Sequence, residues 1–318
     1  MRNQLKGLFT EYWEYLAIQT ACKTNILDYI AEGSNTVESI LLRKKFNEKV
    51  LVDLLNALEQ SGILIIDGQK ITLTNQGSVL TENHQKSLKY ACIHWGEESL
   101  SAWQNLEYTL TTGKPAFEEI YGEAMFDYLS SRKDKLANYH KAMDEYARDD
   151  YEFIAEEIDF VQYKSVMDVG GGLGALIKTV KKNNPNLDCM LYEKPEVIEL
   201  CNLENIRTIG GSFFENIPQL ADCLILSRII HDWDDEKALQ ILANCYSALP
   251  DEGAIIIVEN FVDGIDNKAA LLSLNMELIC KSFERTEVEY VKLLNKAGFE
   301  IDSIKQLNEL QYIIKAKK

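Results

Sequence analysis

Three glycines at alternate positions follow a short apolar run in the middle of the chain. Residues 168–174 read Asp-Val-Gly-Gly-Gly-Leu-Gly, and a helical pattern begins at Ala175. Glycine is required where a strand turns sharply into a helix and its backbone must approach a ligand closely. The free N–H groups at the start of that helix would face the ligand. This turn therefore predicts a nucleotide-cofactor site at four residues, Asp168, Gly170, Gly172 and Gly174.

Two classes of cofactor are compatible with this turn. Gly170, Gly172 and Ala175 satisfy the G-x-G-x-x-G/A pattern of dinucleotide sites. The turn lies midway along the chain, however, whereas dinucleotide domains often begin with it, and a third glycine stands at Gly174. The downstream run His-Asp-Trp-Asp-Asp, residues 231–235, has no role in hydride transfer. These observations favour S-adenosylmethionine over NAD.

Further residues could complete a cofactor site. Glu193 ends the next apolar run, and its carboxylate could accept hydrogen bonds from ribose hydroxyls. An ordinary carboxylate at the end of a strand is the alternative. Beyond the run 206–209, Ser212 and Phe213 could meet the edge and the face of an adenine, or simply belong to a connecting loop.

His231 follows the apolar run 223–227. The carboxyl ends of parallel strands meet at one edge of a sheet, so we expect His231 beside the glycine turn. A hydroxyl that attacks a sulfonium methyl group must lose its proton, and an imidazole can accept that proton. We therefore predict that His231 is a general base, with a structural or solvated histidine as the alternative.

Two carboxylates could orient the imidazole of His231. Glu259 ends the run 254–259 and is expected at the same edge of the sheet. Glu284 precedes a predicted helix, where a carboxylate favoured by the helix dipole is the alternative. A glutamate that accepts a hydrogen bond from one imidazole nitrogen leaves the other nitrogen free for the substrate proton.

The pattern of predicted secondary structure differs between the two halves of the chain, and the second half contains most of the residues named above. Residues 158–318 contain short apolar runs that alternate with helical stretches, which is typical of a doubly wound parallel sheet. The last two strand candidates, 299–305 and 311–316, follow the predicted helix 287–297 and would pair as a hairpin. The predicted fold class is therefore α/β, with a Rossmann-like domain.

The first half of the chain has a helical pattern. Residues 1–98 predict helices closed by a two-stranded ribbon, 63–66 and 70–73, around Asp67 and Gly68, which indicates a winged-helix-like domain. Residues 99–157 predict a helical connector rich in aromatic residues. A DNA-binding regulator is an alternative, but the candidate recognition helix 48–60 has Lys49 as its single basic residue.

Composition narrows the classes of partner. The 33 Lys and Arg against 50 Asp and Glu give a net charge of −17, which repels nucleic acid and anionic lipid. The seven cysteines form no CxxC pair, so we expect them to be reduced in a cytoplasmic protein. Because no apolar run approaches the ~20 residues of a spanning helix, we expect no membrane segment.

Nearly the whole chain, through the order and spacing of its segments, resembles the plant caffeic-acid-type and bacterial small-molecule O-methyltransferases, which include acetylserotonin and phenazine enzymes. The matching segments are 102–103, 112–117, 139–143, 166–174, 210–214, 230–235 and 284–299. The resemblance implies a class I methyltransferase domain that uses S-adenosylmethionine without a metal and releases S-adenosylhomocysteine. It also implies a homodimer through the N-terminal domain and an aromatic or phenolic acceptor, a secondary metabolite.

The resemblance also implies a role for each matched residue. Glu193 would bind the ribose, Phe213 and Trp233 would flank the adenine, and Arg228 would be a basic cofactor contact. His231 would be the base, with Glu259 and Glu284 beside it. The acceptor pocket would be lined by Tyr139, Met143 and Met276.

Several positions depart from the pattern of this family. Ser212 stands where the family has aspartate, Ser273 stands where aspartate is frequent, and Lys281-Ser282 replace two common glycines. Because these positions flank the cofactor and the acceptor, the sequence does not predict which molecule is methylated. Transfer to nitrogen or carbon, and a reaction that keeps the cofactor without transferring methyl, remain alternatives.

Overall fold

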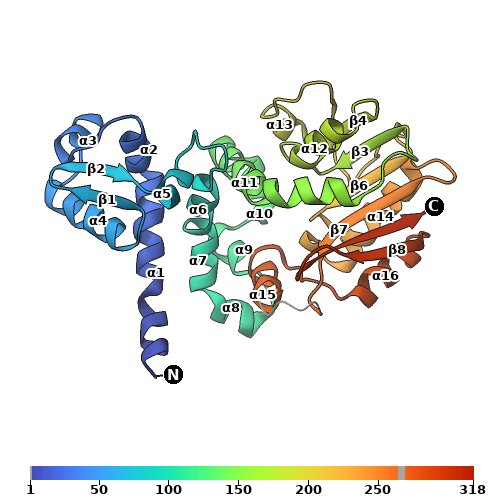
Figure 1. Ribbon diagram of the computed structural model, residues 1–318. Coiled ribbons are helices and arrows are strands. Elements are labelled where there is room, and N and C mark those ends of the chain that lie inside the picture. Colours follow the sequence, from blue (N-terminus) through green and yellow to red (C-terminus); the bar gives the residue numbers. More distant parts are fainter. Residues whose placement is uncertain (1, 264–268) are drawn as a thin grey trace. The chain divides into compact units, whose positions relative to one another are not determined.

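The computed structural model describes residues 2–263 and 269–318 (Figure 1). The chain forms two compact units, one of residues 1–100 with 141–146, the other of residues 101–140 with 147–318. Helix α11 (Lys133–Glu157) therefore contributes to both units. Within the described ranges, no helix combines the length and the apolar character needed to cross a bilayer.

The first unit is mainly helical, as expected. Its elements are α1 (Arg2–Lys23), α2 (Ile26–Ala31), α3 (Val37–Arg43), α4 (Glu48–Gln60), β1 (Leu64–Asp67), β2 (Lys70–Leu73), α5 (Asn75–Val79) and α6 (Lys89–Trp95), and α7 (Glu98–Gln104) begins at its end. The side chain of Asn47 caps α4, and Leu51, Leu55 and Leu58 bury one face of that helix. The predicted ribbon is an antiparallel hairpin that pairs Ile66 with Ile71. Its classification as a winged helix stays a prediction.

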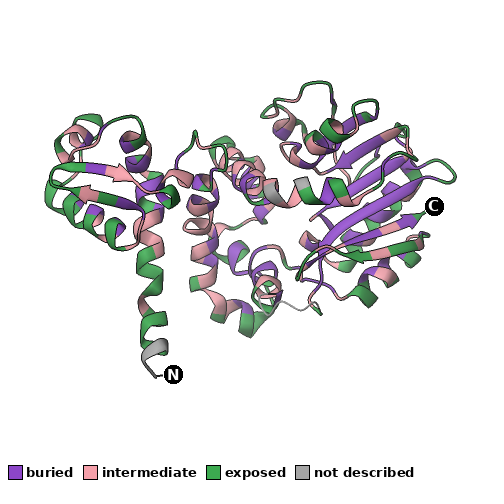
Figure 2. Cartoon of the chain, viewed as in Figure 1, coloured by how far each residue is buried: buried purple, intermediate pink, exposed green. Residues whose placement is uncertain are grey.

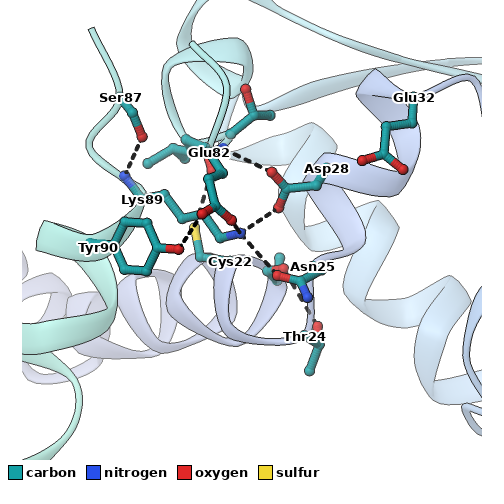
Figure 3. A network of polar contacts seen from close by, with 12 residues as sticks. Cys22, Thr24, Asn25, Asp28, Glu32, Glu82, Ser87, Lys89 and Tyr90 are labelled. Atoms are coloured by element: carbon teal, nitrogen blue, oxygen red, sulfur yellow. Dashed lines mark hydrogen bonds and ion pairs between the residues drawn. The ribbon is translucent and has the colours of Figure 1, made fainter. Parts of the chain in front are cut away.

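A buried lysine connects several segments of this first unit (Figure 3). Lys89 is 3% exposed, and its ammonium group contacts Asp28 Oδ2 at 2.9 Å, Asn25 Oδ1 at 2.9 Å and Glu82 Oε2 at 3.2 Å. Tyr90 donates its hydroxyl proton to Glu82 Oε1 at 2.5 Å. A buried charge is tolerated when it is paired and hydrogen-bonded in this way. The network therefore holds α2, the segment before α6 and α6 itself together.

The stretch 141–146 of α11 is bonded to the same unit. Lys141 donates from its ammonium group to the Tyr90 hydroxyl at 2.8 Å and to Glu82 Oε1 at 3.3 Å. Glu145 accepts a hydrogen bond from the backbone N–H of Ala91 at 2.8 Å. These bonds explain why six residues of a long helix belong to a unit that otherwise ends at residue 100.

The second unit is built on one sheet. Its strands are β3 (Ser165–Val169), β4 (Asp188–Glu193), β5 (Arg207–Gly210), β6 (Cys223–Ser227), β7 (Ala254–Asn260), β8 (Glu300–Gln306) and β9 (Gln311–Lys317), in the order β5-β4-β3-β6-β7-β9-β8. The first five are parallel, whereas β9 is antiparallel to both β7 and β8. The predicted α/β class, a mostly parallel sheet with a C-terminal antiparallel hairpin, is confirmed.

Both faces of this sheet are covered, and its central strands are buried (Figure 2). On one face pack α14 (Asp235–Ala248) and α16 (Glu287–Lys296), and on the other α12 (Ala175–Asn183) and Ile154 of α11. The remaining helices are α8 (Leu106–Thr112), α9 (Ala116–Tyr121), α10 (Met125–Ser130), α13 (Pro195–Ile198) and α15 (Ala269–Cys280). Every residue of β7 is buried, as expected for a strand covered on both faces.

Candidate active site

The strand order of the sheet reverses between β3 and β6. One half of the parallel sheet runs outward from β3 through β4 to β5, and the other runs from β6 to β7. Ligands of open α/β sheets bind at this switch point, outside the carboxyl ends of the strands. The glycine turn follows β3 and the histidine turn η1 (Ile230–Asp232) follows β6, so both predicted segments lie at the switch point.

The three alternating glycines have left-handed backbone conformations. Their φ angles are +75° at Gly170, +57° at Gly172 and +77° at Gly174. A Cβ atom on Gly170 would also lie 2.7 Å from the Ile229 side chain. Other residues rarely adopt this conformation, and here they would also collide with a neighbour. The turn is therefore built as expected for a close approach of backbone to ligand.

Two carboxylates lie beneath and beside this turn. Asp168 is buried, and neither of its carboxylate oxygens has a hydrogen-bond partner among the described residues. Burial, and then the charge of Glu193, raise the pKa of Asp168 to about 7. Glu193 accepts hydrogen bonds from the N–H groups of Gly172 at 3.0 Å and Lys194 at 2.7 Å, and burial raises its pKa. A ligand with hydroxyl or ammonium donors would satisfy these carboxylates.

An aromatic cluster surrounds Trp233, directly after the histidine turn. Its ring centroid lies 6.0 Å from that of Phe213, 4.6 Å from Phe214 and 5.3 Å from Phe126, with which it stacks. The indole Nε1 is buried without a hydrogen-bond partner in the part of the chain that the structure describes. The structure thus brings Phe213 and Trp233 together, while Ser212 Oγ accepts a hydrogen bond from the N–H of Phe214 at 3.3 Å.

Arg228 also has a left-handed backbone, with φ of +53°. Its N–H donates to the carbonyl of Val258 at 2.9 Å, and its guanidinium lies 5.6 Å from the ring centroid of Tyr151. Burial would lower the pKa of Arg228, but Tyr151 and Asp150 outweigh burial and raise it. Its predicted contact with the cofactor stays a prediction.

The imidazole of His231 is buried among three carboxylates. Its Nδ1 lies 2.8 Å from Glu284 Oε1 and 3.8 Å from Glu259 Oε2, and its Nε2 lies 3.6 Å from Asp232 Oδ1. The structure therefore brings together the predicted base and both carboxylates predicted to accompany it, although they come from three separate segments.

Glu259 and Glu284 hold the histidine in different ways. Glu259 Oε1 accepts hydrogen bonds from the backbone N–H groups of Ile229 at 3.0 Å and Ile230 at 2.7 Å, so it fixes the turn. Glu284 contacts the ring itself through Nδ1. A proton on Nδ1 that is shared with a carboxylate leaves Nε2 as the nitrogen for acid–base chemistry.

The charges of this cluster are strongly coupled. Burial alone would lower the pKa of His231, but Glu284, Glu259 and Asp232 outweigh burial and raise it to about 10. Burial raises the pKa of Glu259 to about 7 and that of Asp232 to about 6. The three carboxylates therefore make the imidazole a stronger base than an isolated histidine.

The same three side chains could geometrically accommodate a metal ion. One ligand atom from each of His231, Glu259 and Glu284 lies within 4.8 Å of the others. However, Nδ1 and Glu284 Oε1 are at hydrogen-bonding distance, and Glu259 Oε1 is occupied by backbone N–H groups. The donor set therefore fits a hydrogen-bonded acid–base group better than a metal centre.

Comparison with known proteins matches residues 103–300, more than half of the chain, to the model of the O-methyltransferase domain. The chain belongs to this family of O-methyltransferases. It is therefore an enzyme of methyl transfer, and the resemblance predicted from the sequence is confirmed.

Three similar proteins extend over nearly the whole O-methyltransferase chain. A 3-amino-4-hydroxybenzoate 4-O-methyltransferase from Streptomyces cremeus is 31% identical and covers 96% of this chain and 87% of its own. A phenazine-1-carboxylate N-methyltransferase from Pseudomonas aeruginosa is 25% identical over 99% and 97% of the two chains. The crystal structure of human N-acetylserotonin methyltransferase with SAM has a TM-score of 0.90 at 24% identity, covers 100% and 97% of the two chains, and shows the same fold.

The residues predicted to contact the acceptor are divided between the two units of the O-methyltransferase. Met276 is buried on α15, and Tyr139 on α11 lies 6.2 Å from Phe126 between ring centroids, both in the second unit. Burial raises the pKa of Tyr139. Met143 belongs to the stretch assigned to the first unit, so its role in an acceptor site stays a prediction.

Sequence reasoning gave no role to two residues that lie beside the predicted site residues of this O-methyltransferase, Asp232 and His140. Asp232 had a signal, because it directly follows His231. His140 lies in the matched segment 139–143, but the resemblance gave it no role: its Nδ1 would lie 3.3 Å from a Cβ atom on Gly172, which is distant in sequence. Burial, and then Lys194, lower the pKa of His140 to about 4, so this ring is neutral beside the glycine turn.

Proposed function

We propose that this enzyme transfers the methyl group of S-adenosylmethionine to a hydroxyl of an aromatic or phenolic small molecule, a secondary metabolite, with His231 as the general base. The contact between His231 and Glu284 at the carboxyl edge of the sheet carries this proposal. An imidazole with one nitrogen bonded to a carboxylate is oriented to receive a proton on the other.

The cofactor part of the proposal rests on the glycine turn and its carboxylates. S-adenosylmethionine supplies a methyl group on a positively charged sulfonium. The carboxylate of Glu193 beside Gly172 would accept hydrogen bonds from a ribose, and the buried carboxyl group of Asp168, close to Gly171, would add further acceptor oxygens beside the turn. Phe213 and Trp233 provide apolar faces for an adenine ring. These residues would bind and orient the cofactor.

The role of His231 as a base rests on a comparison of its pKa with that of a phenol. A phenol has a pKa of ~10, close to the value of about 10 to which the neighbouring carboxylates raise the pKa of His231. A proton can therefore move from the acceptor hydroxyl to Nε2 at little cost in free energy. Glu284 and Glu259 stabilise the resulting imidazolium. A nearby sulfonium would lower the pKa of His231 and so favour its neutral, basic form.

The acceptor class is inferred from the surroundings of the base. Phe126, Tyr139 and Trp233 place aromatic rings near the carboxyl edge, which suits a planar acceptor. The relative from Streptomyces cremeus is named for transfer to the 4-oxygen of a hydroxybenzoate, whereas the relative from Pseudomonas aeruginosa is named for transfer to nitrogen. A nitrogen acceptor that is already unprotonated needs no base, so the requirement for His231 separates the two reactions.

A test of the base uses His231→Gln. We expect S-adenosylhomocysteine to bind this variant within threefold of the wild-type affinity in calorimetry. Methyl transfer to a panel of phenols should fall about 10² to 10⁴-fold. Near-normal transfer to phenols would reject His231 as the base. Failure of the wild-type protein to bind the cofactor would reject the whole assignment, whereas transfer to anilines alone would identify a nitrogen acceptor.

The predicted homodimer is also part of this proposal. Apolar side chains that are 50–67% exposed form one stripe of α1, with the three- and four-residue spacing of a single helix face: Leu5, Leu8, Phe9, Tyr12 and Trp13. A stripe of this kind marks a surface for association. We expect light scattering to report a dimer, and Phe9→Glu together with Trp13→Glu to convert it to a monomer. A monomeric wild-type protein would contradict this expectation.

A further inference from the structure

Ser282 bonds to carbonyl groups of the histidine turn and the residue after it, whereas Glu259 bonds to N–H groups of that turn. Ser282 is 0% exposed, and its hydroxyl donates to the carbonyl oxygens of His231 and of Trp233, the latter at 3.1 Å. One hydroxyl proton is shared between these two acceptors. Ser282 therefore bonds to the backbone of the predicted base and to that of the predicted adenine contact.

The position of Ser282 depends on the end of α15. Lys281 has a left-handed backbone with φ of +56°, which turns the chain back after the helix. The N–H of Ser282 donates to the carbonyl of Met276 at 3.4 Å. Ser282 thus connects the helix that carries Met276 to the turn that carries His231.

Arg285 provides a second set of bonds to the same turn. Its guanidinium donates to the carbonyl oxygens of Ile230 at 3.0 Å and Trp233 at 2.8 Å. The carbonyl of Trp233 therefore keeps a donor if Ser282 is removed. In the described chain, Ser282 is the side chain found bonded to the carbonyl of His231, which makes the histidine more dependent on Ser282 than Trp233 is.

We propose that Ser282 is a positioning residue, which fixes the backbone of His231 so that the imidazole keeps its bond to Glu284. This inference rests on the proposed role of His231. Glycine is common at this position in the family that the chain resembles, and glycine has no hydroxyl to donate. The hydroxyl of Ser282 thus supplies a bond to the backbone of His231 that a glycine could not supply.

The ring of His231 lies near three carboxylates. Glu284 lies in the turn after α15, Glu259 lies on β7, and Asp232 lies on the same turn as the histidine. Movement of the backbone would change the distance from the ring to all three carboxylates. Because these carboxylates raise the pKa of His231, loss of the Ser282 hydroxyl should lower it.

The experiment compares Ser282→Ala, Ser282→Gly and Ser282→Thr in the full chain. Ser282→Thr keeps the hydroxyl, and Ser282→Gly supplies the residue common in the family, so at least one hydroxyl-free variant is expected to fold. Ser247→Ala, which removes an exposed hydroxyl on α14, is the control. The imidazole signals of the four histidines are titrated by NMR, with His231→Gln assigning the signal of His231.

We expect Ser282→Ala and Ser282→Gly to lower the pKa of His231 by about one unit and kcat for phenol methylation about tenfold. The affinity for S-adenosylhomocysteine should change less than threefold, and Ser282→Thr should restore both the titration and kcat. A lower melting temperature with an unchanged His231 titration would overturn the proposal. The titration requires no acceptor, so a failure of the proposed reaction would be seen separately, as absent turnover in the wild-type enzyme.

Discussion

The Nδ1 atom of His231 lies 2.8 Å from Oε1 of Glu284, a residue 53 positions later in the chain. This contact has two chemical consequences. It assigns the shared proton to Nδ1 and leaves Nε2 for the acceptor, and it places a buried carboxylate where it stabilises the imidazolium that forms when the acceptor is deprotonated. The geometry and the basicity of the ring thus depend on the same residue.

The pH profile of catalysis tests whether the basicity of His231 depends on Glu284. Because the pKa of His231 is raised to about 10, kcat/KM for a phenol should increase as the pH rises from neutral and level off near that value. Glu284→Gln removes a charge that raises the pKa of His231, so the increase should level off at a lower pH and at a lower rate. Glu287→Gln, an exposed neighbour, should match the wild-type profile. If Glu284→Gln lowers kcat/KM but leaves the pH at which it levels off unchanged, this account is contradicted.

Glu193 should control affinity for the ribose of the cofactor. Glu193→Gln keeps the size of the side chain but replaces one acceptor oxygen by a donor, so we expect S-adenosylhomocysteine to bind about ten- to a hundredfold more weakly in calorimetry. Adenosine should lose affinity likewise, whereas 2′,3′-dideoxyadenosine should not. Glu199→Gln changes an exposed carboxylate and should have no effect. If adenosine and its dideoxy analogue lose the same amount of affinity, Glu193 has a structural role and does not bind the ribose.

Lys281 should be replaceable by residues that tolerate a left-handed backbone. At φ of +56°, a side chain with a Cβ atom costs of order 1 kcal/mol, and β-branched side chains cost more. Lys281→Gly and Lys281→Asn should therefore unfold at or above the wild-type melting temperature, whereas Lys281→Val should lose several degrees. A valine variant as stable as the glycine variant would exclude strain at this position.

Catalysis should not depend on a divalent cation. Nδ1 of His231 is bonded to Glu284 Oε1, and Glu259 Oε1 accepts hydrogen bonds from backbone N–H groups, so one ligand atom of each residue is already hydrogen-bonded, although Glu259 Oε2 and Glu284 Oε2 have no such partner among the described residues. Treatment with a chelator followed by dialysis should leave methyl transfer within twofold of its starting rate. Loss of activity that added zinc or magnesium restores would instead identify the cluster of His231, Glu259 and Glu284 as a metal centre.

The sheet and its ends could be predicted because the signals are local. The parallel strands β3, β4, β6 and β7 are short, almost wholly buried runs, and the glycines and the histidine of the site follow β3 and β6. The ends differ by one residue: Asn260 extends β7, β8 begins and ends one residue later than the predicted 299–305, and β9 begins at the predicted residue 311 but ends one residue after 316. Hydrogen bonding to a neighbouring strand sets these limits, and apolar content does not report it.

Contacts between distant segments could not be predicted in the same way. The sequence predicts that Glu259 and Glu284 both lie near His231, but it does not assign them different roles. Which glutamate binds the ring and which binds the backbone depends on the path of the turn after α15. Ser282 was visible as a departure from a family pattern, and its two carbonyl partners were not. His140 lies against Gly172 because α11 packs there, which no spacing in the chain encodes.

The predicted segments 1–98, 99–157 and 158–318 treat the chain as three consecutive pieces. Residues 141–146 belong instead with the first hundred residues, through Lys141 and Glu145, although the helix that contains them is otherwise part of the second unit. A single crossover near residue 100 would therefore separate Lys141 and Glu145 from Tyr90 and Ala91. A chimera that takes its first unit from a relative must therefore also take residues 141–146 from that relative. Otherwise these six residues need compensating substitutions.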